Sequence, residues 1–227
     1  MRPTLSIIVP HWNTPLPLLR RLLESVPSSV GPDLSWDLWV VDDESASPLR
    51  MEDIATTTDL SRRLHIVRLR QHSGIGSARQ VGVLASSGEF LTFLDSDDYV
   101  RRGALVAMAA MAAENMLVFA DHLVVQCDGE TFARRKRGWA GLSEKYRGTV
   151  DCPFLYCNFI VVPVLVSRAA VECVGGYPSA GYAGEQVLFY GALARRAEVD
   201  FLHLDTIGYE YWPRENGSAL SNPERNR

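Results

Sequence analysis

Three carboxylates fall within four residues of this chain, in the run Asp95-Ser96-Asp97-Asp98, called the acidic run below. Charges of one sign repel at this spacing, so the ionised forms are costly unless solvent or a cation compensates them. Carboxylate oxygens suit Mg²⁺ or Mn²⁺, which often share their coordination sphere with substrate phosphates. The run therefore predicts a divalent cation that bridges a diphosphate. Helix capping is the simpler alternative, because Asp97 or Asp98 could accept backbone N–H bonds at a helix start.

Short apolar runs and helical spacing indicate the elements that position this run. Strands are predicted at residues 6–9, 38–41, 64–69 and 90–94, and helices at residues 16–26 and 77–85. The first two strand runs are predominantly apolar, as expected for strands buried on both faces of a parallel sheet. Asp42 and Asp43 follow the second strand, and Asp95 follows the fourth. Ligands of open parallel sheets bind beyond the carboxyl ends of the strands, so we expect these carboxylates to gather in a site.

The remaining pattern is less regular. The first helix is predicted to end at Pro27-Ser28-Ser29, and a further helix, two strands and a polar loop or hairpin are expected at residues 103–113, 116–119, 122–127 and 132–149. The predicted fold class is α/β, with a mostly parallel, Rossmann-like central sheet flanked by helices and a small antiparallel extension in the second half. One domain is expected over residues 1–221, followed by a polar tail at residues 222–227.

Composition limits the classes of function. The 227 residues are 47% hydrophobic and carry a net charge of −4, which fits one large domain and argues against nucleic acid as the main partner. No apolar stretch approaches the ~18 residues of a membrane-spanning helix, and the opening apolar run is too short for a signal peptide. The four cysteines lack metal-binding spacing. We therefore expect a cytoplasmic protein with reduced thiols.

One strongly basic cluster, Arg134-Arg135-Lys136-Arg137 with Trp139, falls in the predicted polar loop. Such a cluster could attract a phosphorylated acceptor or anionic lipid headgroups, which would give a peripheral membrane contact. A solvated loop is the alternative. The five histidines are scattered, so they are expected to be structural, with His72 closest to the proposed site.

The acidic run ends an ordered series of motifs. Its members are residues 6–13 (SIIVPHWN), 41–45 (VDDES), 74–82 (GIGSARQVG) and 85–98 (ASSGEFLTFLDSDD). In this order the series resembles the family 2 glycosyltransferases, and the resemblance extends through most of the chain. It implies a GT-A fold, a nucleoside diphosphate sugar donor that is commonly UDP-linked, an Mn²⁺ or Mg²⁺ cofactor, and inversion at the anomeric carbon. Residues 1–100 would then form the nucleotide-sugar-binding half and residues 101–221 the acceptor-binding half.

The resemblance also implies roles for residues of the first half. Asp42 or Asp43 would accept a hydrogen bond from the uracil imide. Asp95 would hold the ribose hydroxyls and Asp97 the metal. Arg79 would contact the base or a phosphate, with a solvated helix face as the alternative. The predicted nucleotide-binding residues are Pro10, Trp12, Asn13, Asp42, Asp43, Gly74, Arg79, Asp95 and Ser96.

In the second half, Gly175-Gly176-Tyr177-Pro178 and the later Glu185-Gln186 pair are similar to the family's glycine–aromatic turn and its Glu-Asp helix start. Gly176 and Tyr177 are therefore predicted to bind the acceptor. The family's general base is commonly the aspartate, but Gln186 occupies that position here and cannot take a proton at neutral pH. Glu185 is the predicted substitute base. The alternative is a structural carboxylate at the helix start, where the helix macrodipole favours a negative charge.

Residues 211–221 resemble the family's C-terminal loop, which often closes on the diphosphate with a histidine. No histidine occurs there, so Arg214 is the predicted diphosphate contact, with a solvated arginine as the alternative.

Two other classes of function fit parts of the pattern. Gln186 and the missing histidine are compatible with a non-catalytic module that binds a nucleotide sugar or a partner. A phospho-accepting receiver domain also has carboxylates at strand ends, but this chain is too long and lacks a lysine at a late strand end. The sequence does not identify the acceptor, which could be a sugar, a lipid-linked molecule or a small molecule, nor does it predict the oligomeric state.

Overall fold

The computed structural model describes residues 4–125, 130–134, 163–179 and 184–212. Its strands are β1 (Leu5–His11), β2 (Trp36–Asp42), β3 (Leu64–Arg68), β4 (Phe90–Phe93), β5 (Tyr99–Val100), β6 (Met116–Val125), β7 (Thr131–Arg134), β8 (Val164–Ser167) and β9 (Asp200–Tyr211). Its helices are α1 (Leu16–Val30), α2 (Met51–Ile54), α3 (Thr58–Arg63), α4 (Ile75–Ala85), α5 (Ala104–Ala109), α7 (Arg168–Cys173) and α8 (Glu185–Ala194).

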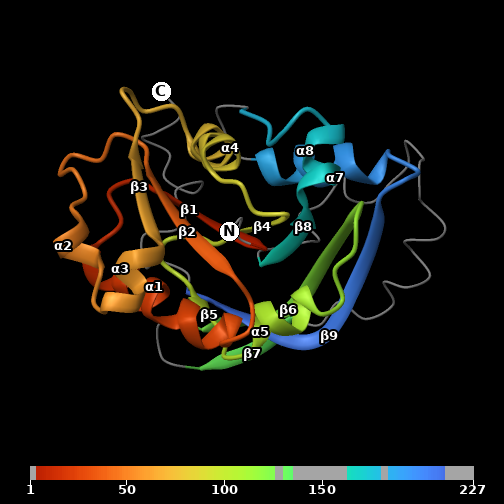
Figure 1. Ribbon diagram of the computed structural model, residues 1–227, viewed down its shortest axis with the longest axis horizontal. Coiled ribbons are helices and arrows are strands. Elements are labelled where there is room, and N and C mark those ends of the chain that lie inside the picture. Colours follow the sequence, from red (N-terminus) through yellow and green to blue (C-terminus); the bar gives the residue numbers. More distant parts are fainter. Residues whose placement is uncertain (1–3, 126–129, 135–162, 180–183, 213–227) are drawn as a thin grey trace.

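All described strands belong to one sheet in the order β3-β2-β1-β4-β8-β6-β9-β5, with β7 paired to β6. Strands β1 to β4 are parallel, whereas β8 runs antiparallel to both β4 and β6. Strand β9 is parallel to β6 and antiparallel to β5, which follows the acidic run. In Figure 1, helices α4, α7 and α8 lie on one face of the sheet and α1 and α5 on the other. The predicted α/β class, with a parallel first half and antiparallel additions, is confirmed.

Three boundary predictions are wrong. Helix α1 continues through Pro27 to Val30, because the buried Val26 and Val30 extend its packed face past the unfavourable proline. Strand β6 is continuous instead of two strands, and the expected interruption is a β-bulge at Asp121, where the pairing with β9 shifts. Helix α5 is shorter than residues 103–113 and begins after a left-handed glycine.

Other sequence predictions are tested only in part. Among the helices that the structure describes, none combines the length and apolar character needed to cross a bilayer. Cys173 is a free thiol, and the other cysteines lie outside the described residues. The polar tail and most of the basic cluster lie outside them as well.

Helix α4 packs closely on β1, and this packing positions the start of α4 over the ends of the parallel strands. Ile7, Ile8 and Val9 of β1 have no exposed surface. At Gly82 of α4, an added Cβ would lie 2.4 Å from Cγ2 of Ile8. The backbone of α4 can therefore reach this position only because residue 82 has no side chain.

We expect Gly82→Ala to lower the free energy of unfolding by about 1–3 kcal/mol, because the new methyl group overpacks the contact with Ile8. Urea denaturation followed by circular dichroism measures the change. Leu84→Ala on the same helix is the control, since Leu84 is 73% exposed. A loss no larger than that of the control would contradict the tight contact between α4 and β1.

Candidate functional site

The ends of three parallel strands bring the predicted residues of the first half to one edge of the sheet. The register of β1 and β2 pairs His11 with Asp42, and the backbone N–H of Asp43 donates to the carbonyl of His11 at 2.8 Å. On the other side of β1, the N–H of Leu94 donates to the carbonyl of Ile8 at 3.0 Å. The loops after β1, β2 and β4 therefore leave the sheet side by side.

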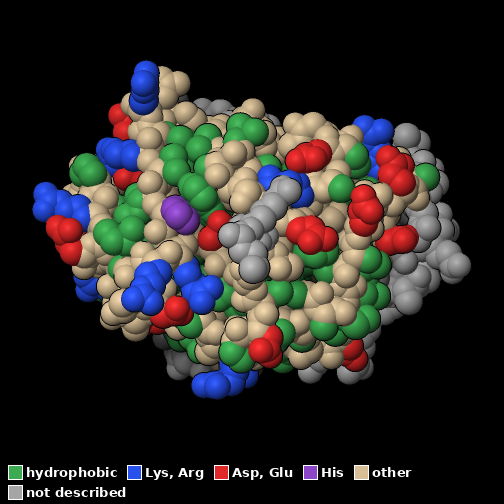
Figure 2. Space-filling model, in the orientation of Figure 1, with side chains coloured by type: hydrophobic (Ala, Val, Ile, Leu, Met, Phe, Trp, Pro, Cys, Tyr) green, Lys and Arg blue, Asp and Glu red, His purple; other side chains and the backbone are tan. Residues whose placement is uncertain are grey.

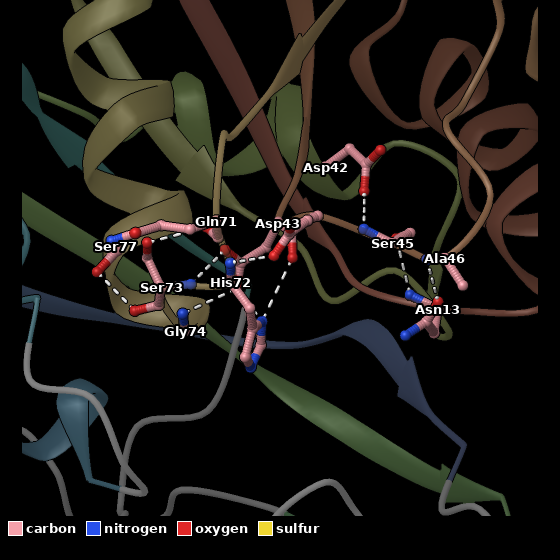
Figure 3. A network of polar contacts seen from close by, with 11 residues as sticks. Asn13, Asp42, Asp43, Ser45, Ala46, Gln71, His72, Ser73, Gly74 and Ser77 are labelled. Atoms are coloured by element: carbon pink, nitrogen blue, oxygen red, sulfur yellow. Dashed lines mark hydrogen bonds and ion pairs between the residues drawn. The ribbon is translucent and has the colours of Figure 1, made fainter.

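Asp43 organises the turn that leads into α4. Its Oδ1 accepts from the backbone N–H of Ser73 at 2.7 Å, and its Oδ2 accepts from Gly74 at 2.8 Å (Figure 3). His72 Nδ1 lies 2.9 Å from the same Oδ2, and the His72 ring stacks on Trp12 at a centroid distance of 4.2 Å. Gly74 has φ +88°, a conformation that a glycine adopts without strain. Trp12, His72 and Asp43 thus form one contiguous group.

Asp42 has a different environment from Asp43. It is fully buried, accepts from the N–H of Ser45 at 2.8 Å, and forms an ion pair with Arg68. Burial raises the pKa of Asp42, but the bonds from Ser45 and Arg68 outweigh burial and leave the pKa below its ordinary value. Asp42 is therefore an ionised anchor of the loop after β2, which leaves Asp43 as the stronger candidate for a ligand contact.

Asn13 ties the loops after β1 and β2 together. Its backbone N–H donates to Oγ of Ser45 at 2.9 Å, and its Oδ1 accepts from the N–H of Ala46 at 2.8 Å. Figure 3 shows this pair of bonds beside the Asp42–Ser45 contact. Asn13 therefore shapes the walls of the site through the loops that it connects.

Arg79 joins the two halves of the domain in the interior. It has no exposed surface; Nη2 lies 2.6 Å from Asp95 Oδ1, and Nη1 lies 3.0 Å from Glu185 Oε1. Nη1 also donates to the hydroxyl of Tyr177 at 2.8 Å. Burial lowers the pKa of Arg79, but Tyr177, Asp95 and Glu185 outweigh burial and raise it, so the guanidinium stays charged. We infer that Arg79 positions Asp95 rather than presenting its charge to solvent.

The acidic run is held by several elements. The backbone N–H of Asp95 donates to the hydroxyl of Tyr209 at 2.9 Å, and Oγ of Ser96 lies 2.6 Å from Oγ1 of Thr14. The N–H of Trp212 donates to Oδ1 of Asp98 at 2.9 Å. Asp98 thus caps the end of β9 rather than a helix.

Electrostatics at the acidic run favour a cation. Burial raises the pKa of Asp95 despite its pairing with Arg79, and the nearby charge of Asp97 raises it further. Burial also raises the pKa of Asp98, and the charges of Asp95 and Asp97 raise it further. Figure 2 shows acidic side chains around the middle of the displayed face and toward its right side. A bound cation would relieve this repulsion.

The donor atoms fit a divalent metal that takes part of its coordination from a substrate. Within the described residues, no group of three His, Cys, Asp or Glu side chains could hold a metal ion. The acidic run nevertheless offers hard carboxylate oxygens, of which Asp97 is half-buried and acts electrostatically on both neighbours. Mg²⁺ and similar ions are commonly bound by one or two carboxylates together with substrate phosphates. Asp97 is the residue that would hold such an ion here.

We expect Asp98→Asn to raise the free energy of unfolding of the metal-free protein by about 1 kcal/mol at pH 7, because it removes a buried charge. The asparagine Oδ1 can still accept from Trp212. Since the pKa of Asp98 is raised in the folded state, the wild type gains stability as pH falls through that pKa toward ~3.9, and the difference should shrink. Thermal melts at pH 7 and pH 5 measure it. A difference that grows at pH 5 would contradict this assignment.

The predicted acceptor and base residues are packed against the site from the second half. The ring of Tyr177 is buried, with centroids 4.9 Å from Phe93 and 4.5 Å from Phe189, and its N–H donates to Gln80 Oε1 at 2.7 Å. Gly176 has φ +97°, and a Cβ there would lie 2.6 Å from the same Gln80 oxygen.

Glu185 is buried at the start of α8 and pairs with Arg79. Gln186, which follows it, is partly exposed. The predicted diphosphate contact Arg214 lies outside the described residues. The structure therefore places Glu185 in a structural ion pair and leaves its role as base a prediction.

Sequence reasoning misses four residues that hold the acidic run, namely Thr14, Arg21, Tyr209 and Trp212. Thr14 follows the predicted nucleotide-binding loop directly, so its position was an available signal. Trp212 acts through its backbone N–H, for which no residue type is required. Arg21 and Tyr209 lie 76 and 114 residues from their partners in the run, and no local pattern connects them.

The α/β sheet, with its acidic run beyond β4 next to an ordered turn beyond β2, has the GT-A fold that the sequence predicts. The family model described as glycosyl transferase family 2 matches residues 6–175. The chain belongs to this family.

Solved structures agree in fold. S. aureus TarS 1-349 in complex with UDP-GlcNAc has a TM-score of 0.69 at 21% identity, over 98% of this chain and 61% of that one. The mannosyltransferase PcManGT from Pyrobaculum calidifontis, in complex with GDP-Man and Mn²⁺, has a TM-score of 0.70 at 17% identity, over 96% and 59%.

Curated relatives are glycosyltransferases by name. The pre-mycofactocin glycosyltransferase of Mycobacterium tuberculosis is 30% identical over 152 residues, which is 65% of this chain and 32% of the relative. An uncharacterized glycosyltransferase of Haemophilus influenzae is 28% identical over 128 residues, which is 56% of this chain and 50% of the relative. The matches therefore span half or less of these relatives.

Proposed function

We propose that this domain transfers a sugar from a nucleoside diphosphate sugar, most favourably a UDP-sugar, to an acceptor hydroxyl, with a divalent metal and with inversion. One observation carries the proposal: the start of α4 links both carboxylate positions of the sheet edge. Gly74 of the α4 N-terminus donates to Asp43, and Arg79 of the same helix pairs with Asp95. The carboxylate proposed to bind the base, Asp43, and the one proposed to bind the ribose, Asp95, are thereby held in one fixed arrangement.

The group of Trp12, His72 and Asp43 supplies the proposed base contacts. An indole beside the site offers an apolar face for a planar base, and the Asp43 carboxylate can accept from an imide N–H. The bonds from Ser73 and Gly74 fix the direction of that carboxylate. One of the two structural neighbours is in complex with UDP-GlcNAc and the other with GDP-Man, so the base of the donor nucleotide is the first variable to test.

Asp97 supplies the proposed contact to the metal on the leaving-group side. A divalent ion there would stabilise the charge that grows on a departing nucleoside diphosphate. The chain's own contribution is to fix the acidic run before the donor binds. Arg79 pairs with the Asp95 carboxylate from the interior. Tyr209 of β9 accepts from the backbone N–H of Asp95, and Trp212, which follows β9, donates its backbone N–H to Asp98.

A second candidate function follows from Glu185. An inverting displacement needs a carboxylate to take the acceptor proton. The Glu185 carboxylate is buried and bonded to Arg79, and Gln186 cannot replace it. This pairing favours, as the alternative, a module that binds nucleotide sugar without turning it over.

Titration of the 227-residue chain with UDP-, GDP- and dTDP-sugars, with and without Mn²⁺, tests both functions. Calorimetry reports binding, and release of the nucleoside diphosphate in the presence and absence of sugar acceptors reports turnover. Metal-stimulated binding with release supports the transferase. Binding without release supports the binding module, and no binding of any donor with Mn²⁺ present overturns both.

A further inference from the structure

Arg21 of α1 contacts the acidic run through its backbone. Its Nη2 donates to the carbonyl oxygen of Asp97, and its guanidinium carbon lies 4.2 Å from the ring centroid of Trp212. Trp212 in turn donates its backbone N–H to Asp98 at 2.9 Å. One arginine therefore joins α1, the acidic run and the residue that follows β9.

The remaining members of the run are held by other segments. Asp95 is bonded by Tyr209 and Arg79, and Ser96 by Thr14. Arg21 instead donates to the peptide group that links Asp97 to Asp98. A guanidinium on a carbonyl fixes the orientation of that peptide plane, and with it the direction in which the Asp97 side chain leaves the backbone.

The chemistry of Arg21 argues for a positioning role rather than a surface ion pair. Arg21 reaches the run through a backbone carbonyl, although three carboxylates lie in the run that it contacts. Its Nε atom is buried without a hydrogen-bond partner, so ordering this side chain has a cost. The stacking on Trp212 offsets part of that cost.

We propose that Arg21, stacked on Trp212, is a positioning residue that sets the Asp97 carboxylate for metal binding. The proposal rests on the proposed function, in which Asp97 holds a divalent ion together with a nucleoside diphosphate. Residues that orient a metal ligand typically change metal affinity about 10–100-fold when they are lost. Loss of Arg21 should therefore weaken the metal-dependent part of nucleotide binding and leave the metal-free part unchanged.

Mn²⁺ titrations at fixed UDP, followed by calorimetry, test the proposal with Arg21→Met and Arg21→Lys. We expect Arg21→Met to raise the half-saturating Mn²⁺ concentration about tenfold and Arg21→Lys to raise it less, because lysine keeps one charged donor. The matched control is Arg20→Met, since Arg20 is adjacent on α1 but donates to the Asp53 carbonyl at 2.6 Å. UDP affinity without metal should be the same in all variants.

Trp212→Ala separates the two contacts, because it removes the stacked ring and keeps the backbone N–H to Asp98. Trp212→Ala should also raise the half-saturating Mn²⁺ concentration, and it replaces Arg21→Met as the test variant if Arg21→Met does not fold. Wild-type Mn²⁺ dependence in the Arg21 variants, an equal loss without metal, or an equal shift in Arg20→Met would overturn the proposal. Failure of the wild type itself to bind UDP with Mn²⁺ overturns the proposed function, which distinguishes the two failures.

Discussion

Asp97→Asn is expected to lower sugar transfer at least ~100-fold, because losing one electrostatic contact to a developing charge commonly costs 10²–10³ in kcat. The amide is neutral and a much weaker ligand for Mn²⁺ or Mg²⁺ than a carboxylate. The departing diphosphate would then leave without a cation held by the protein. The loss should appear mainly in kcat and in metal-stimulated donor binding.

The fold should tolerate this substitution. The bond from Arg21 goes to the backbone carbonyl of Asp97, which asparagine retains. The charge of Asp97 raises the pKa values of Asp95 and Asp98, so removing that charge also relieves the repulsion on these two carboxylates. Thermal stability of the metal-free variant should therefore equal or exceed that of the wild type.

Release of the nucleoside diphosphate, measured with and without Mn²⁺, checks the prediction. Asp59→Asn is the matched control, because Asp59 is an exposed carboxylate that pairs with Arg63 on α3. A variant at position 97 that keeps more than half of the activity would show that the metal, if used, is held elsewhere.

The first half of the fold was predictable because its signals are local. Apolar runs over β1, β2 and β4 identify buried parallel strands without reference to any partner. Strand β9 was not predicted. Its sequence, from Asp200 to Tyr211, mixes apolar and polar residues, and most of them are only partly buried. Its place in the sheet comes from pairing with β6 and β5, which no short pattern reveals.

The site shows the same division between local and distant information. The position of Asp43 after a strand end can be predicted from the sequence. Its partners Ser73 and Gly74, however, contribute backbone N–H groups 30 and 31 residues away. Arg79 reads as a residue on a helix face, yet the structure buries it completely. Burial of a charge there depends on a carboxylate 106 residues later, at Glu185. Sequence spacing cannot show that such a partner exists.

This burial makes Arg79 the residue whose loss should destabilise the fold most. Arg79→Met keeps much of the side-chain volume but leaves Asp95 and Glu185 without their common cation. Breaking a buried ion pair by removing one partner typically costs about 3–5 kcal/mol. The hydroxyl of Tyr177 also loses its donor. We therefore expect the free energy of unfolding to fall by about that amount.

Urea denaturation of a double-mutant cycle tests where this energy comes from. Adding Glu185→Gln to Arg79→Met removes one of the two uncompensated charges, so the double variant should be less unstable than the sum of the single variants by about 1–3 kcal/mol. Arg101→Met is the control, because its ion pair with Glu210 is partly exposed and should be worth less than about 1 kcal/mol. If Arg79→Met lowers the free energy of unfolding no more than Arg101→Met does, the charges of Asp95 and Glu185 are compensated by solvent or by a proton that the two carboxylates share. The two halves of the domain would then not depend on this arginine for their connection.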